Sequence, residues 1–178
     1  LRLHHELDHR ADLVVVDSLD WSLLGGGVVL TTNQLKVEKL VRPGAEVLPA
    51  AARVWAMAVQ VTAETGVPID SSAAEETLFW SPTLRRLRLD SPFGRRNVRP
   101  LSKPAVALRF DFRATAAAIR PENVELELEL IEDGRANAVV FWWEAPLGSG
   151  GLLTSAPLAA ASKDATRVDL GQALQFLP

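Results

Sequence analysis

Residues 124–143 read VELELELIEDGRANAVVFWW, the most regular pattern in the chain. In its first half, apolar residues alternate with glutamates; the apolar positions are Val124, Leu126, Leu128 and Leu130. This alternation predicts a half-buried strand with its apolar side chains, Leu128 among them, facing the core. Asp133 and Gly134 are typical of a tight turn, so we expect residues 136–143 to return as the second strand of a hairpin.

Other segments extend this picture in both directions. Residues 13–16 are a short apolar run, typical of a strand buried on both faces of a parallel sheet, and residues 32–41 predict the helix that follows it. From residue 45 onward, segments 46–48, 53–62, 106–112, 152–155 and 173–177 favour strands, the first two hinged at Pro49. The residues therefore predict the end of a parallel α/β sheet followed by an antiparallel barrel or sandwich.

Composition excludes several classes of protein. The 178 residues are 48% apolar and 23% charged, enough for a buried core and an ordinary polar surface. The net charge of -3 favours neither nucleic acid nor an anionic membrane as partner, and no apolar run is long enough to span a bilayer. Cysteine is absent, which excludes a disulfide framework. The chain starts at Leu1 without a secretory signal, so we expect a piece of a longer protein.

Four local motifs have a functional and a structural interpretation. His5, Glu6 and His9 match the zinc-protease pattern H-E-x-x-H, but no downstream histidine exists and a solvated turn is favoured. The glycines of residues 25–27 lack the spacing of a phosphate loop, which favours a simple turn. The run 141–143 (Phe-Trp-Trp) indicates core. The last motif is a basic cluster, for which a solvated loop is favoured over a phosphate site: Arg85, Arg86, Arg88, Arg95, Arg96 and Arg99.

Three segments together resemble the protein arginine N-methyltransferase family, most closely the first catalytic module of its type 7 members. The first is ADLVVVDSLDWSLLGGG (residues 11–27), similar to the strand and loop that carry the family's two catalytic glutamates. The second is LSKP (101–104) followed by RFDF (109–112). The third comprises RANAVVFWWE (135–144), TSAP (154–157) and QALQFLP (172–178).

The resemblance implies an α+β, mostly β fold: the end of a Rossmann-like methyltransferase domain (residues 1–48), followed by an incomplete β-barrel substrate and dimerisation domain (49–178). It implies S-adenosyl-L-methionine as cofactor, with a site upstream of this piece. In the family, two carboxylates grip and orient the substrate guanidinium. Asp17 takes the place of the first glutamate and is the predicted catalytic residue, whereas Gly26 takes the place of the second.

The resemblance also leaves alternatives open. Glu144 and Asp20 are the candidates for a compensating carboxylate, and Asp169-Leu170 stands where the family has a His-Trp substrate pair. We expect part of an enzyme that methylates arginine in protein substrates, in the cytoplasm or nucleus, paired with a second methyltransferase module in cis or as a homodimer. The alternative is a catalytically inactive scaffold or pseudo-dimer module.

Overall fold

The computed structural model of the chain describes residues 10–23, 25, 27–37, 39–62, 84–114, 124–148 and 150–177. Strands dominate these residues, so the chain is α+β and mostly β, as predicted. In chain order the elements are β1 (Ala11–Val15), α1 (Val28–Val37), β2 (Val41–Leu48), β3 (Ala51–Val61), β4 (Arg85–Leu87), α3 (Pro92–Asn97), β5 (Val98–Pro100), β6 (Ala105–Asp111), β7 (Ala138–Leu147), β8 (Gly151–Thr154), β9 (Ala165–Arg167) and β10 (Gln172–Phe176).

The two N-terminal strands form a small parallel sheet. β1 pairs with β2, and α1 connects them, which confirms the predicted α/β unit. The prediction that this strand, β1, is buried on both faces is wrong, because Leu13 is 49% and Val15 67% exposed. Among the described residues β1 pairs with β2 alone, and nothing covers the face that carries these two side chains.

The helix begins four residues earlier than the sequence predicted. Gly27 has a φ of +74°, which reverses the chain direction, and α1 starts at the next residue. Val28 is fully buried in the core, so packing outweighs the modest helix propensity of valine. The helix ends at Val37, because Val41 already pairs with β1 as the first residue of β2.

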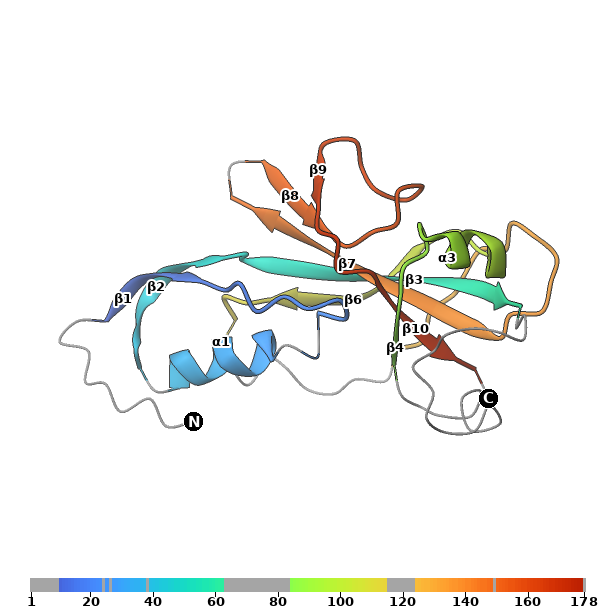
Figure 1. Cartoon of the computed structure of the whole chain (residues 1–178). Helices are drawn as coiled ribbons and strands as arrows, with labels where there is room; N and C mark the ends of the chain where they lie inside the picture. The colour runs from blue at the N-terminus through green and yellow to red at the C-terminus, as the bar shows by residue number, and fades with distance from the viewer. Residues whose placement is uncertain are drawn as a thin grey trace, which may run out of the picture.

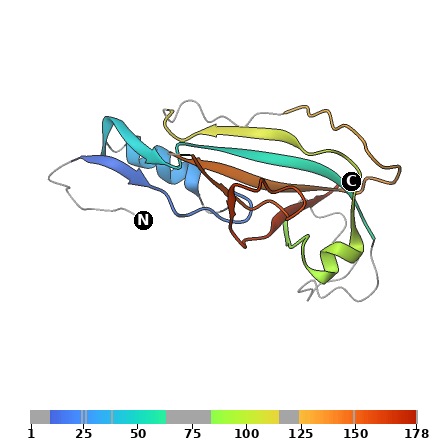
Figure 2. The same cartoon turned by 90° about the horizontal axis from the view of Figure 1, so that it is seen from above.

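The remaining strands form one curled sheet. Its order is β4-β10-β7-β3-β5, while β6 also pairs with β3, and β8 continues from β7 to β9. Most pairs are antiparallel; β8 and β9 are parallel. Seen from above, β6, β3 and β7 lie side by side, and β8 and β9 rise from the end of β7 (Figures 1 and 2). The predicted strands at 46–48, 53–62, 106–112, 152–155 and 173–177 correspond to β2, β3, β6, β8 and β10.

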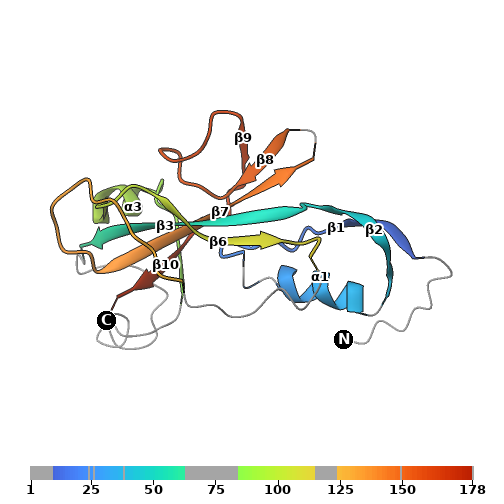
Figure 3. The same ribbon diagram turned by 180° about the vertical axis from the view of Figure 1, so that it is seen from behind.

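The long strands β3 and β7 have a core on each face. One cluster joins Val16, Leu23 and Val28 to Trp143, and the other joins Met57 and Val140 to the neighbouring Trp142. Adjacent residues of a strand point to opposite faces, so the paired tryptophans enter different cores. Their burial confirms the predicted core position of this run. The first cluster lies at the end of the long strands that is near α1. Helix α3 lies near their opposite end (Figure 3).

The predicted strand over residues 124–130 does not form. Only one isolated bridge, between Ser102 and Leu130, involves this segment, and the hairpin with residues 136–143 is therefore wrong. Val124 is 47% and Leu130 68% exposed, while Leu128 is half-buried rather than part of the core. Strand β7 pairs with β3 and β10 instead. From the sequence, Ser71 or Ser72 would cap a short helix over residues 72–77, but that segment lies outside the described residues.

Candidate functional site

Asp17, the predicted catalytic residue, stands where the chain leaves the small parallel sheet. Val16 is 8% exposed, and its backbone N–H donates to the carbonyl of Leu48 at 2.8 Å. Asp17 follows this last hydrogen bond to β2 and is exposed. Ligands of open α/β sheets bind at the carboxyl ends of the strands. The carboxylate of Asp17 is therefore placed at an edge suited to ligand binding.

Asp20 holds the turn that follows, and we refer to residues 17–27 as the 17–27 loop. Ser22 donates to Asp20 Oδ1 through its backbone N–H at 3.0 Å and its hydroxyl at 2.9 Å. The Ser22 hydroxyl oxygen in turn accepts the backbone N–H of Gly25 at 2.9 Å. An acidic side chain that accepts the N–H two residues on is an Asx turn, which fixes the local backbone. Asp20 is thus a positioning residue of the loop, and we do not assign it as a second substrate carboxylate.

Trp143 ties the 17–27 loop to the curled sheet. The indole Nε1 of Trp143 donates to the backbone carbonyl of Asp20 at 2.7 Å, across 123 residues of sequence. Trp143 is 1% exposed, and Leu23, from the same loop, is fully buried in the same cluster. The hydrogen bond and the apolar contacts together set where the loop lies relative to β7.

Glycine at position 25 is required by space. A Cβ there would lie 2.4 Å from Oδ2 of Asp20 and 3.3 Å from the Ser22 hydroxyl, the two groups that hold the turn. At Gly27 the positive φ requires glycine instead. Gly26, at the place of the family's second glutamate, lies outside the described residues. Two glycines of the 25–27 run thus have structural roles in the turn before α1.

Glu144 does not supply the missing carboxylate. Its side chain accepts the indole N–H of Trp55 at 2.8 Å, and the guanidinium of Arg53 lies 3.8 Å from the same oxygen. These partners come from β3 on the face opposite to Trp143. Glu144 is 7% exposed and satisfied there. We therefore do not assign Glu144 as the compensating carboxylate.

Asp169-Leu170, at the place of the family's substrate pair, lies against β4. The carboxylate of Asp169 pairs with Arg88 at 3.1 Å, and the carbonyl of Leu170 accepts Nε of Arg86 at 2.7 Å. A cavity of about 290 Å³ adjoins this contact; its lining residues are Arg88, Asp90, Ser91, Pro92, Arg167, Asp169, Gly171 and Gln172. Each charged side chain of this lining is in an ion pair, since Arg167 meets Asp90 at 2.7 Å.

Most arginines of the basic cluster lie in short regular elements rather than in a loop: Arg85 and Arg86 in β4, Arg95 and Arg96 in α3, and Arg99 in β5. All of the cluster except Arg85 is exposed, so the predicted solvation is confirmed and only the predicted loop is wrong. The strands were missed because β4 and β5, of three residues each, carry too few apolar residues to show a pattern. Their positions are set by pairing with β10 and β3.

The structure offers no metal site among the residues it describes. No group of three histidine or acidic side chains in that part of the chain could hold an ion. The motif His5, Glu6 and His9 lies outside the described residues, so the zinc-protease interpretation stays untested. Neither of the described helices has the length and apolarity to cross a membrane.

The amino-acid sequence of this chain is similar to sequences of known proteins. No protein-family model matches the chain. A rice (Oryza sativa subsp. indica) protein arginine N-methyltransferase 7 is 26% identical over 165 residues, which is 85% of this chain and 22% of the relative. The enzyme of the same name from Drosophila ananassae is 26% identical over 172 residues, or 88% and 25%. The chain thus spans about a quarter of the length of these curated relatives.

Solved structures support the same fold. Protein arginine methyltransferase 10 of Arabidopsis thaliana matches with a TM-score of 0.67 at 15% identity, covering 98% of this chain and 57% of that one. The Trypanosoma brucei PRMT1 enzyme-prozyme heterotetrameric complex with AdoHcy matches with a TM-score of 0.61 at 12% identity, covering 98% and 54%. The predicted resemblance to protein arginine N-methyltransferases, including the type 7 enzymes, is confirmed.

Proposed function

We propose that this chain, a relative of the protein arginine N-methyltransferases, forms the substrate-side loop and barrel of an enzyme that methylates arginine in proteins. The observation that carries the proposal is the placement of Asp17. It is exposed at the carboxyl end of β1, at the start of a loop that the bond from Trp143 to Asp20 fixes to the sheet. A carboxylate so placed is suited to grip a guanidinium, because the two groups form charge-assisted hydrogen bonds.

We assign the cofactor, S-adenosyl-L-methionine, to parts of the full-length protein outside these residues. When bound, it would supply the methyl group. No described residue is assigned to hold it. The open face of β1, with Leu13 and Val15 exposed, supports the presence of further elements against this small sheet, because parallel sheets are normally covered on both faces. We place the domain boundary between residues 48 and 49, where the small sheet gives way to the curled one.

The role of Asp17 follows from the chemistry of its partner. A guanidinium with a pKa above about 12 stays charged at neutral pH, so a single carboxylate both binds and orients it. With glycine at position 26, this interaction lacks a second carboxylate from that position. Loss of one charge-assisted hydrogen bond of about 1.5–3 kcal/mol corresponds to a rate lower by about 10- to 150-fold.

A catalytically inactive module is the second candidate, and two substitutions relative to the family favour it. Glycine replaces a catalytic glutamate at position 26, and Asp169 is paired with Arg88 where the family has a substrate histidine. One of the structural neighbours is an enzyme-prozyme complex, which supports assembly with a second methyltransferase module as the alternative role.

Methyl transfer to an arginine peptide by the full-length protein separates the two candidates. Gly26→Glu is expected to raise turnover, and Asp17→Asn to abolish it. Asp12→Asn is the matched control, because Asp12 lies in β1, is exposed, and among the described residues forms an ion pair with Arg42, away from the 17–27 loop. Unchanged turnover in Asp17→Asn would contradict the assignment of the loop. Absence of turnover in every variant, the restored one included, would favour the scaffold.

A further inference from the structure

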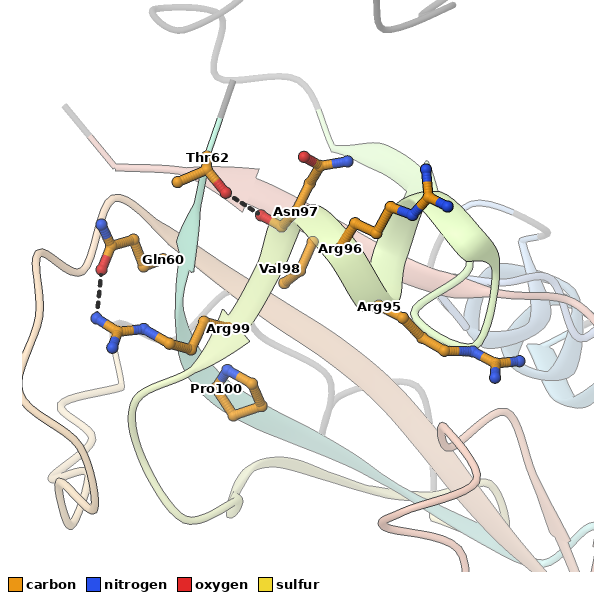
Figure 4. Close-up of a pocket in the computed structure, with 8 residues that line it drawn as sticks. All are labelled: Gln60, Thr62, Arg95, Arg96, Asn97, Val98, Arg99 and Pro100. Atoms are coloured by element: carbon orange, nitrogen blue, oxygen red, sulfur yellow. Dashed lines mark hydrogen bonds between the residues drawn. The ribbon is translucent and has the colours of Figure 1, made fainter. Parts of the chain in front are cut away.

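A second concave site lies at the opposite end of β3 from the 17–27 loop. It is a cavity of about 470 Å³ between the end of β3, α3 and β5 (Figure 4). Three arginines line it, namely Arg95, Arg96 and Arg99, and no carboxylate is among its lining residues. The methyltransferase proposal gives this site no role.

The three guanidinium groups keep their positive charge unneutralised. Arg95 donates from Nε to the backbone carbonyl of Asp90 at 2.7 Å, whose carboxylate is already paired with Arg167. Arg99 uses Nη2 for two neutral acceptors, Oε1 of Gln60 at 2.7 Å and the backbone carbonyl of Asp133 at 2.9 Å. The guanidinium of Arg96 makes no hydrogen bond or ion pair within the described part of the chain. Elsewhere in that part, Arg42, Arg53, Arg88, Arg113 and Arg167 are in ion pairs.

The backbone that presents these arginines is firmly held. Ser91 caps α3 by accepting the N–H of Gly94 at 3.0 Å. A Cβ at Gly94 would lie 2.5 Å from backbone oxygens of the preceding turn, so α3 packs directly against that turn. Asn97 is 6% exposed, and its carbonyl accepts the N–H of Thr62 at 2.8 Å, which ties the end of α3 to the end of β3. The backbone that carries the three arginines is therefore ordered before any ligand binds.

The arrangement favours a short acidic peptide as the ligand. Arg99 points toward Gln60, whereas Arg95 and Arg96 point away from that pair, so the three charges are spread apart (Figure 4). Spread charges suit a segment with several carboxylates better than one isolated anion. Clusters of arginine are a recurring means of recognising acidic protein motifs.

One observation disfavours nucleic acid at this site. No aromatic side chain lines the cavity, so bases have no surface on which to stack. We propose that the cavity formed by β3, α3 and β5 is a docking site for an acidic segment of a partner protein.

Fluorescence anisotropy with a labelled hexaglutamate peptide tests the proposal on the full chain. The wild-type chain is expected to bind it, more weakly as salt rises, and not to bind the hexaglutamine analogue. Arg96→Gln, which removes a guanidinium that forms no ion pair with the described residues, is expected to weaken binding about ten-fold. Combined replacement of Arg95, Arg96 and Arg99 by glutamine is expected to abolish it.

A charge-matched variant distinguishes the site from a general charge effect. Lys39, Arg109 and Lys163 are exposed and lie outside the cavity, so their joint replacement by glutamine should leave peptide binding intact. Equal weakening in this control would overturn the proposal. So would absence of binding by the wild-type chain, full affinity in Arg96→Gln, or tighter binding of a labelled single-stranded RNA that depends on the same arginines. The readout is independent of methyl transfer, so it does not depend on the proposed enzyme activity.

Discussion

Replacement of Gly25 by alanine tests how the 17–27 loop is held. The new Cβ would lie 2.4 Å from Oδ2 of Asp20, closer than real Cβ contacts. Asp20 cannot simply rotate away, because its other oxygen accepts both the backbone N–H and the hydroxyl of Ser22. The backbone of residue 25 does not have a positive φ, so alanine is unfavourable there for steric reasons alone.

The expected cost follows from these contacts. Forcing a methyl group into a well-packed site typically costs about 1–3 kcal/mol. Asp20→Ala loses two hydrogen bonds to a charged acceptor, and we expect it to cost about 2–3 kcal/mol by itself. In the Asp20→Ala background the clashing oxygen is gone, so adding Gly25→Ala should cost less than about 0.5 kcal/mol. The double-mutant cycle should therefore give a coupling of about 1–2 kcal/mol.

Urea unfolding of the wild-type chain, both single variants and the double variant measures the coupling directly. Gly148→Ala adds the same methyl group where nothing lies within 4 Å, although its φ of +27° adds some backbone strain. Gly151→Ala, with its nearest contact at 3.4 Å, is the cleaner control. Additive costs of Asp20→Ala and Gly25→Ala would refute the assignment of Asp20 as the residue that holds the loop.

Three further predictions concern the sheet and the cofactor. Gly94→Ala should destabilise by about 1–3 kcal/mol, because its Cβ would lie 2.5 Å from the carbonyl oxygen of Arg88, and thermal unfolding should show Gly151→Ala nearly unchanged. Glu144→Ala should cost about 1–3 kcal/mol by leaving the indole N–H of Trp55 unpaired, whereas Glu144→Gln keeps an acceptor and should cost less in the same denaturation assay. Titration calorimetry of the 178-residue chain with S-adenosyl-L-methionine should detect no tight binding, and a low-micromolar dissociation constant would contradict our placement of the cofactor site outside it.

Much of the curled sheet could be predicted from side-chain alternation, because its long strands have one side facing a core. Both tryptophans of β7 are buried, as the prediction of a core segment at 141–143 requires. The prediction at residues 124–130 failed for a physical reason. Alternation predicts which side chains of a strand share a face, but it does not predict which other strand pairs with it. That segment runs beside residues 101–103 with two backbone hydrogen bonds, Lys103 N–H to Glu129 and Ile131 N–H to Leu101. Two hydrogen bonds are too few to form a β-ladder, and the leucines of residues 124–130 are half-buried or exposed.

In the candidate site, too, contacts between residues close in sequence could be predicted, whereas contacts between distant residues could not. Asp20 and Ser22, two residues apart, form an Asx turn that the sequence alone could have indicated. The bond from Trp143 could not be read from any local pattern, because the two residues are 123 positions apart and meet only through the packing of β7 against the loop. The arginine cavity also depends on distant pairing, since β3 and β5 bring Gln60 and Arg99 together.

The bonds that hold the described part of the 17–27 loop join Asp20, Ser22, Gly25 and Trp143. Asp17 takes part in none of these four bonds. Loop shape and catalytic charge can therefore be changed separately. A variant such as Asp17→Asn should keep the stability of the chain while losing turnover, and Trp143→Phe should weaken both. If turnover is lost only when stability is lost, Asp17 does not act on the substrate, and the loop serves the assembly of the protein rather than its chemistry.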